Sequence, residues 1–176
     1  MANRAAIREL QSRLAARLQA ARTEGGSVSW LAVRAGSKNY LFPLVQAGEI
    51  FSMGVLQRVP YCKPWFRGVL NLRGGLFGVV DLAAFIANGV VPVRSELAAS
   101  EASVVTLHTA LEINCALLVD ALAGLRNLDS FTRADAPSEG EPPFFGNLYT
   151  DATGARWQEI NLQTLAQVPG FLSIGS

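Results

Sequence analysis

The sequence predicts an all-β fold of small barrels, preceded by one helix. Two observations support this prediction. Short apolar runs recur along the chain, and sixteen glycines and eight prolines separate them, a pattern typical of strands joined by tight turns. Hydrophobic residues make up 50% and charged residues 16% of the 176 residues. This composition can fill a sizeable core and is too apolar for disorder.

Residues 3–22, within an N-terminal segment 1–24, are predicted to form an amphipathic helix that ends at the glycines of TEGGS. Four apolar side chains recur at spacings of three and four: Ile7, Leu10, Leu14 and Leu18. Such a stripe can pack on the domain, pair with another helix or lie on a membrane surface. Packing or pairing is favoured, because the stripe is aliphatic and has no Trp or Phe to anchor in a membrane interface.

The first half of the chain predicts two hairpins. The runs 29–36 and 39–46 flank a turn at 35–38, and a further extended run covers 49–59. The second hairpin joins two more runs through a tight turn: FRGVLNL and LFGVVDL, around Arg73-Gly74-Gly75. A short helix, 82–87, follows and is stopped by Asn88-Gly89.

The second half continues this pattern after an exposed connection at 89–102. Residues 103–109 and 110–122 are predicted to pair, and the second run is apolar enough to be a central strand. Residues 124–131 are a strand or a turn, and the polar stretch 129–143 is a surface loop. The last elements are two short strands around Asp151–Gly154 and a closing helix: FFGNLYTD, RWQEINL and INLQTLAQ.

Charge is distributed unevenly, although the net charge is only +1. Residues 25–94 carry seven basic and two acidic side chains, whereas residues 95–176 carry three basic and ten acidic ones. Opposite ends of such a molecule can dock different partners, or the acidic loops can simply keep an apolar protein in solution. The small net charge argues against general binding of nucleic acid.

The sequence predicts a cytoplasmic protein. It has no apolar run long enough to span a bilayer and no signal-peptide pattern. The only cysteines, Cys62 and Cys115, are far apart and are expected to be reduced thiols rather than a disulfide.

No pattern indicates catalysis, a metal or a cofactor. His108 is the only histidine, and no metal-ligand pair or phosphate-binding loop is present. Asp81 and Asp120 each end an apolar strand, where a carboxylate commonly accepts N–H bonds from the next turn or helix. A small-ligand enzyme remains an alternative only if these three side chains converge in one pocket. A nucleic-acid-binding barrel is another alternative, because aromatic and basic residues alternate at 61–67.

Several motifs, in order and spacing, resemble the CheW-like domains of bacterial chemosensory systems. They are YLFP at 40–43, Gly48-Glu49-Ile50, the prolines 60 and 64, GVLNLRG at 68–74, VDL at 80–82, CALLVD at 115–120 and FFG at 144–146. The resemblance covers about 28–170. The N-terminal helix, residues 65–85 and residues 156–167 are most similar to the branch that serves type IV pilus (twitching) systems. Cys115-Ala116 departs from the family, where glycine is common, and ordinary members often lack the helix.

The resemblance implies two intertwined five-stranded SH3-like barrels in residues 25–172, connected near 89–102, with short helices after strands. It implies a non-catalytic adaptor without cofactors that binds the regulatory domain of a CheA-type histidine kinase and the signalling tip of a methyl-accepting receptor. Neither nucleic-acid binding nor direct membrane insertion is implied.

Protein-binding residues are expected in the first half. Glu49 and Arg73 are expected to form a salt bridge that shapes a receptor-facing groove. Four apolar residues are candidates for contact with a receptor helix or for plain core: Ile50, Phe51, Leu56 and Val69. Three aromatic residues are either interface anchors or the plug of a barrel end: Tyr61, Trp65 and Phe66. Asn71 completes the binding set, and four residues are expected to be structural: Gly68, Gly74, Asp81 and Asp120.

Overall fold

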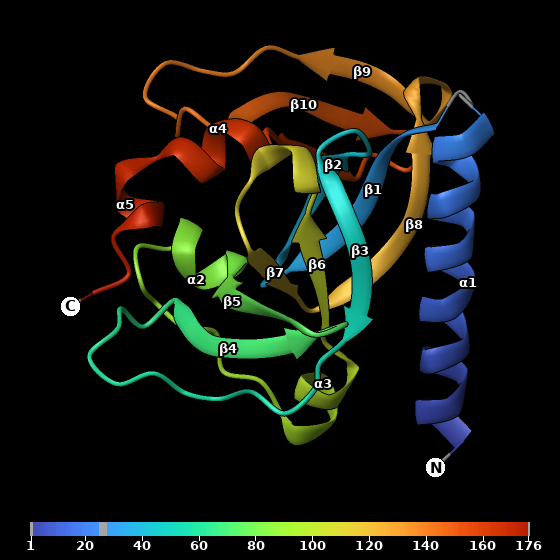
Figure 1. Ribbon diagram of the computed structural model, residues 1–176. Helices are drawn as coiled ribbons and strands as arrows, with labels where there is room; N and C mark the ends of the chain where they lie inside the picture. Colours follow the sequence, from blue (N-terminus) through green and yellow to red (C-terminus); the bar gives the residue numbers. More distant parts are fainter. Residues whose placement is uncertain (1, 25–27, 176) are drawn as a thin grey trace.

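Figure 1 shows the computed structural model of the chain, which describes residues 2–24 and 28–175. The strands in these residues are β1 (Val28–Ala35), β2 (Lys38–Pro43), β3 (Ala47–Ser52), β4 (Phe66–Leu72), β5 (Gly75–Asp81), β6 (Ser103–Leu107), β7 (Cys115–Val119), β8 (Ala121–Asn127), β9 (Phe131–Asp135), β10 (Phe145–Asp151) and β11 (Arg156–Ile160). The helices are α1 (Ala2–Glu24), α2 (Leu82–Ile86), α3 (Glu96–Glu101), α4 (Leu162–Gln167) and α5 (Pro169–Leu172), with 3₁₀ turns η1 (Thr109–Leu111) and η2 (Leu128–Ser130).

The strands form two intertwined sheets, which agrees with the predicted all-β fold, although one sheet has six strands and not the five that the resemblance implied. One sheet has the order β8-β1-β2-β11-β10-β9 and the other β3-β6-β7-β5-β4. The first sheet therefore combines the two earliest strands with the four last, and the strands between them build the second. The chain passes from one sheet to the other at 44–46 and at Asp120, whereas residues 89–102 join β5 to β6 within one sheet. The apolar strand β7 is central, as predicted.

Both predicted hairpins of the first half form. In the second, Leu72 pairs with Gly75, so Arg73 and Gly74 make a two-residue turn, with φ values of 49° and 79°. Positive φ at both positions defines the turn type whose twist suits a hairpin. The side chain of Asn71 stabilises this turn, because its Oδ1 accepts a hydrogen bond of 3.0 Å from the Gly74 N–H.

Some boundaries differ from the sequence prediction. The run 49–59 stays a strand only to Ser52, and beyond it Gln57 pairs with Val69 in an isolated bridge. Gly68 permits this approach, because a Cβ there would lie 2.3 Å from the Gln57 carbonyl oxygen. The expected loop 129–143 contains β9, which gains its hydrogen bonds by pairing with β10. The expected exposed connection contains α3.

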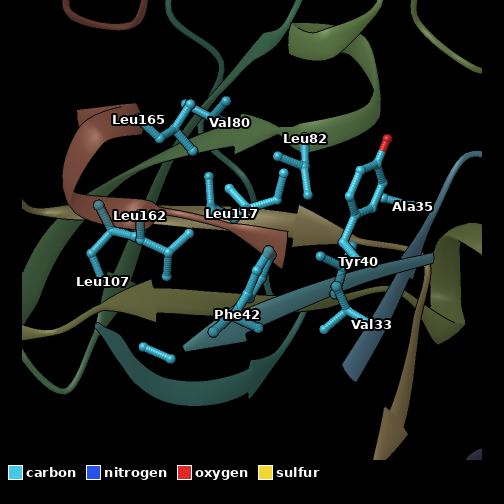
Figure 2. Close-up of a cluster of buried hydrophobic side chains, with 14 of the residues drawn as sticks. Val33, Ala35, Tyr40, Phe42, Val80, Leu82, Leu107, Leu117, Leu162 and Leu165 are labelled. Atoms are coloured by element: carbon cyan, nitrogen blue, oxygen red, sulfur yellow. The ribbon is translucent and has the colours of Figure 1, made fainter. Parts of the chain in front are cut away.

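The main hydrophobic core lies between the two sheets. Figure 2 shows part of it, with side chains from β1 and β2 meeting those of β5, β7 and α4. Phe42, Leu117 and Leu162 are fully buried there, and burial of each contributes about 1.5–3 kcal/mol. Two smaller clusters lie elsewhere on the sheets, one around Leu70 and Val104, the other around Trp30 and Trp157. The two sheets are therefore held together by one shared core.

Helix α1 lies along one side of the molecule, away from α2 and α5 (Figure 1), and contacts β3 and β8. Packing on the domain, one of the alternatives for its apolar stripe, is what the structure shows. However, only part of the apolar stripe is buried. Leu14 is buried, whereas Leu10 is 50% exposed and the polar residue next to it, Gln11, is buried instead. The side chain of Leu18 lies outside the described residues. In the described part of the chain, no helix is long and apolar enough to cross a membrane.

Candidate protein-binding groove and its supporting ion pairs

The expected ion pair between Glu49 and Arg73 is present. Arg73 Nη2 lies 3.2 Å from Glu49 Oε2, and the Arg73 guanidinium lies 5.8 Å from the centre of the Phe51 ring. The two side chains are 75% and 46% exposed, so the pair contributes about 1 kcal/mol or less to stability. Glu49 lies in β3 and Arg73 in the turn that follows β4, and β3 and β4 are the two outer strands of their sheet. The ion pair therefore links the two edges of that sheet through side chains.

A cavity of about 460 Å³ opens beside this ion pair. Its lining comes from β3, the β4–β5 hairpin and residues 106–114. Apolar side chains line it: Phe51, Leu72, Phe77, Leu107 and Ile113. Charged and polar side chains line it as well, among them Glu49, Arg73, His108 and Glu112. We call this cavity the Glu49–Arg73 groove. Interfaces between proteins commonly combine apolar and aromatic side chains with polar groups at their rim.

Only some of the predicted binding residues lie in this groove. Glu49, Phe51 and Arg73 line it, and Asn71 supports its hairpin. Ile50 is buried in the shared core, and Leu56 packs against the smaller cluster around Leu70.

The other candidates lie outside the lining of the groove. Val69 is half-buried and paired with Gln57. Trp65 is a core residue, with its ring 5.0 Å from that of Phe85, and Phe66 packs beside the shared core. Tyr61 is 87% exposed. The structure therefore separates the aromatic loop residues from the groove.

Sequence reasoning missed Arg94, which joins both aspartates that end strands. Its Nη1 lies 2.6 Å from Asp81 Oδ2, and its Nε donates to Asp120 Oδ1. Arg94 is 11% exposed and Asp81 is fully buried. Burial favours a lower pKa for the Arg94 guanidinium, but its hydrogen bonds to the two carboxylates and their charges outweigh this and raise its pKa. The sign of a buried, paired arginine in the sequence was its position at the end of the apolar run VVPVR.

The two aspartates also accept hydrogen bonds from backbone N–H groups. Asp81 accepts from the helix that follows it, as predicted, whereas Asp120 accepts from a distant turn and not from the one that follows it. Asp81 Oδ1 accepts from the Ala84 N–H at the start of α2, at 3.3 Å. Asp120 Oδ2 accepts from the Gly36 N–H in the β1–β2 turn, at 2.6 Å. This second contact joins turns that are far apart in the sequence.

The arrangement does not assemble the proposed catalytic set. His108 lines the Glu49–Arg73 groove and its Nδ1 accepts the Ala110 N–H at 3.1 Å. Asp81 and Asp120 do not line that groove and converge on Arg94 instead. Within residues 2–24 and 28–175, no three His, Cys, Asp or Glu side chains are grouped as a metal site.

Comparison with known proteins identifies the family. A family model described as "CheW-like domain" matches residues 29–168. The chain is 28% identical over 166 residues to Protein PilI of Pseudomonas aeruginosa, covering 92% of this chain and 88% of that protein. Its fold matches the crystal structure of the scaffolding protein TtCheW from Thermoanaerobacter tengcongensis with a TM-score of 0.64 and 16% identity, over 82% of this chain and 96% of that one. The chain therefore belongs to the family of CheW-like domain proteins.

Proposed function

We propose that this chain is a non-catalytic adaptor that couples a methyl-accepting receptor to a CheA-type histidine kinase in a chemosensory system that controls type IV pilus motility. The observation that carries the proposal is the family match over 29–168, extended by similarity to PilI over 92% of the chain. An adaptor of this kind works in the cytoplasm beside membrane receptors.

The geometry of the Glu49–Arg73 groove supports docking of a receptor tip. The ion pair is exposed, so a partner can reach it. The apolar side chains beside it favour binding, because a partner segment would bury them. The pair contributes little to folding, so its variants test binding without unfolding the protein.

Calorimetric titration with a receptor signalling tip and with a kinase regulatory domain tests the proposal. Wild-type protein is expected to bind both. Arg73→Ala is expected to weaken receptor binding about tenfold, which corresponds to about 1.4 kcal/mol. The matched control is Arg133→Ala, because Arg133 forms a similarly exposed pair with Asp135 on β9. Failure of the folded wild type to bind either partner would reject the adaptor function.

A second arm uses the chain with residues 1–24 deleted. If α1 contacts a partner, its deletion weakens one of the two titrations. If α1 only covers the edges of the sheets, the affinities for both partners stay within about twofold of those of the full chain, a difference of about 0.4 kcal/mol.

A further inference from the structure

Part of the lining of the Glu49–Arg73 groove follows β6, in a segment that sequence analysis assigned to a strand. Residues 109–111 form the 3₁₀ turn η1, and His108 Nδ1 accepts the Ala110 N–H at its start. Glu112 ends the turn with φ of 55°, and its N–H donates to the Thr109 carbonyl at 3.0 Å. The turn sets the position of Glu112 beside the groove.

The backbone conformation of Glu112 is an unusual one for glutamate. A side chain with a Cβ is disfavoured at this positive φ, and glycine or asparagine is the usual residue where a helix ends this way. Residues in such conformations concentrate at functional sites. Glycine would be less strained than glutamate in this backbone conformation. We therefore look for a function of the Glu112 side chain.

The charge of Glu112 is not balanced inside the groove. Glu49 and Arg73 neutralise each other, and among the described residues Glu112 has no ion-pair partner. Its side chain is exposed and lines the groove together with Phe51, Phe77 and Ile113. The groove therefore offers an apolar lining with one uncompensated negative charge, that of Glu112.

We propose that Glu112 determines specificity in this groove by selecting a helical partner segment that places a Lys or Arg one turn away from an apolar side chain. The apolar side chain enters between Phe51 and Ile113, and the basic group meets the Glu112 carboxylate. Residues three or four apart share one helix face, which gives this spacing. The inference rests on the proposed function, since the segment is the helical tip of a receptor.

Titration of the full chain with a receptor tip tests this role, with variants that separate binding from folding. Glu112→Gly is expected to weaken binding about fivefold while the Tm stays unchanged or rises by up to about 4 °C, because glycine tolerates the positive φ. Glu112→Lys is expected to weaken binding more than tenfold at low salt, with a smaller loss at about 1 M salt, where the charge is screened. Replacing the basic residues of the tip by Glu is expected to restore binding to Glu112→Lys.

The matched control is Asn88→Gly, because Asn88 also has a positive φ, 53°, and lies outside the lining of the groove. It is expected to leave receptor binding unchanged. If wild-type protein binds the tip and all Glu112 variants bind equally well, the role of Glu112 is rejected and the adaptor function stands. If wild-type protein does not bind the tip, the adaptor function itself fails. Loss of binding in Glu112→Gly with a lowered Tm would assign Glu112 to folding instead.

Discussion

At the scale of single residues, Arg94 connects parts of the chain that no local signal brings together. It comes from the connection between β5 and β6, and it binds the carboxylates at the ends of β5 and β7. One of these carboxylates, Asp81, is fully buried. A buried ion pair contributes little net stability by itself, but the loss of one partner leaves a buried charge alone.

Removal of the Arg94 side chain is therefore expected to be costly. Arg94→Ala should lower the free energy of unfolding by about 3–5 kcal/mol, because Asp81 stays buried without its cation. Urea unfolding measures this change. Arg133→Ala, which removes an exposed arginine, is expected to cost about 1 kcal/mol or less. Equal costs for the two variants would show that the Arg94 cluster is not buried in solution.

Cys115 gives a prediction that depends on pH. Burial in β7 raises the pKa of its thiol from 9.0 to about 12. Since the unfolded thiol ionises at lower pH, the stabilising contribution is full below about pH 9 and is lost as pH rises through about 12. The free energy of unfolding of wild type should therefore fall more over this range than that of Cys115→Ala.

Thiol titration provides a second reading of the same burial. At pH 8 in the native protein, a thiol reagent is expected to react rapidly with Cys62, which is only partly buried. Cys115 should react only after unfolding. If both thiols of the native protein reacted rapidly with the reagent, the burial of Cys115 would be contradicted.

At the scale of elements, α1 is held to the domain by a polar contact inside an apolar interface. Gln11 Nε2 donates to Ser103 Oγ at 2.6 Å, and Ser52 Oγ donates to Gln11 Oε1. Ser103 and Ser52 belong to neighbouring strands, β6 and β3. The contact therefore positions the helix along its axis more specifically than apolar packing alone.

Loss of this contact is expected to loosen α1. In Gln11→Ala the buried hydroxyl of Ser103 loses its partner, at a cost of about 1–3 kcal/mol unless the helix moves away and admits water. Trypsin should then cleave after Arg13 and Arg17 faster than in wild type. Ser12→Ala, which changes an exposed neighbour, is the control and should not alter the rate. Equal cleavage rates in both variants would show that Gln11 does not hold the helix.

At the scale of the whole molecule, the two sheets cannot separate without unfolding. The chain passes between them twice, and side chains from both fill one core. Single domains that share one core commonly unfold in one cooperative transition. The fold therefore presents its binding groove on a body that behaves as one unit.

A substitution in the central strand tests this cooperativity. Leu117→Ala, in the shared core, should lower the free energy of unfolding by about 2–5 kcal/mol. Hydrogen exchange should then lose protection equally in the β6–β7 pair and in the β1–β2 pair, although the latter belongs to the other sheet. Protection retained by β1 and β2 alone would show that the sheets unfold separately.

Local signals were enough for much of the architecture. The hairpin at Arg73-Gly74, the central position of β7, the short helix after Asp81 and the closing helix α4 all follow from turn residues, apolar runs and capping residues. The turn and the two helices depend on neighbours within a few residues, and the central position of β7 was inferred from its unbroken apolar run. The salt bridge of Glu49 and Arg73 was reached through the family resemblance and is present in the structure.

Other features required contacts between distant segments. The polar strand β9 exists because β10 supplies its hydrogen bonds, and Trp65 is core because Phe85 and Phe171 surround it. Arg94 and Glu112 reach their partners and the groove only when strands that are separated in the chain, such as β5 and β7, are paired. The sequence by itself thus determined the family, most strands and the tight turns, because these depend on local propensity and pattern. Tertiary structure alone decided which candidate residues share the groove, because strand pairing and burial join residues that lie far apart in the chain.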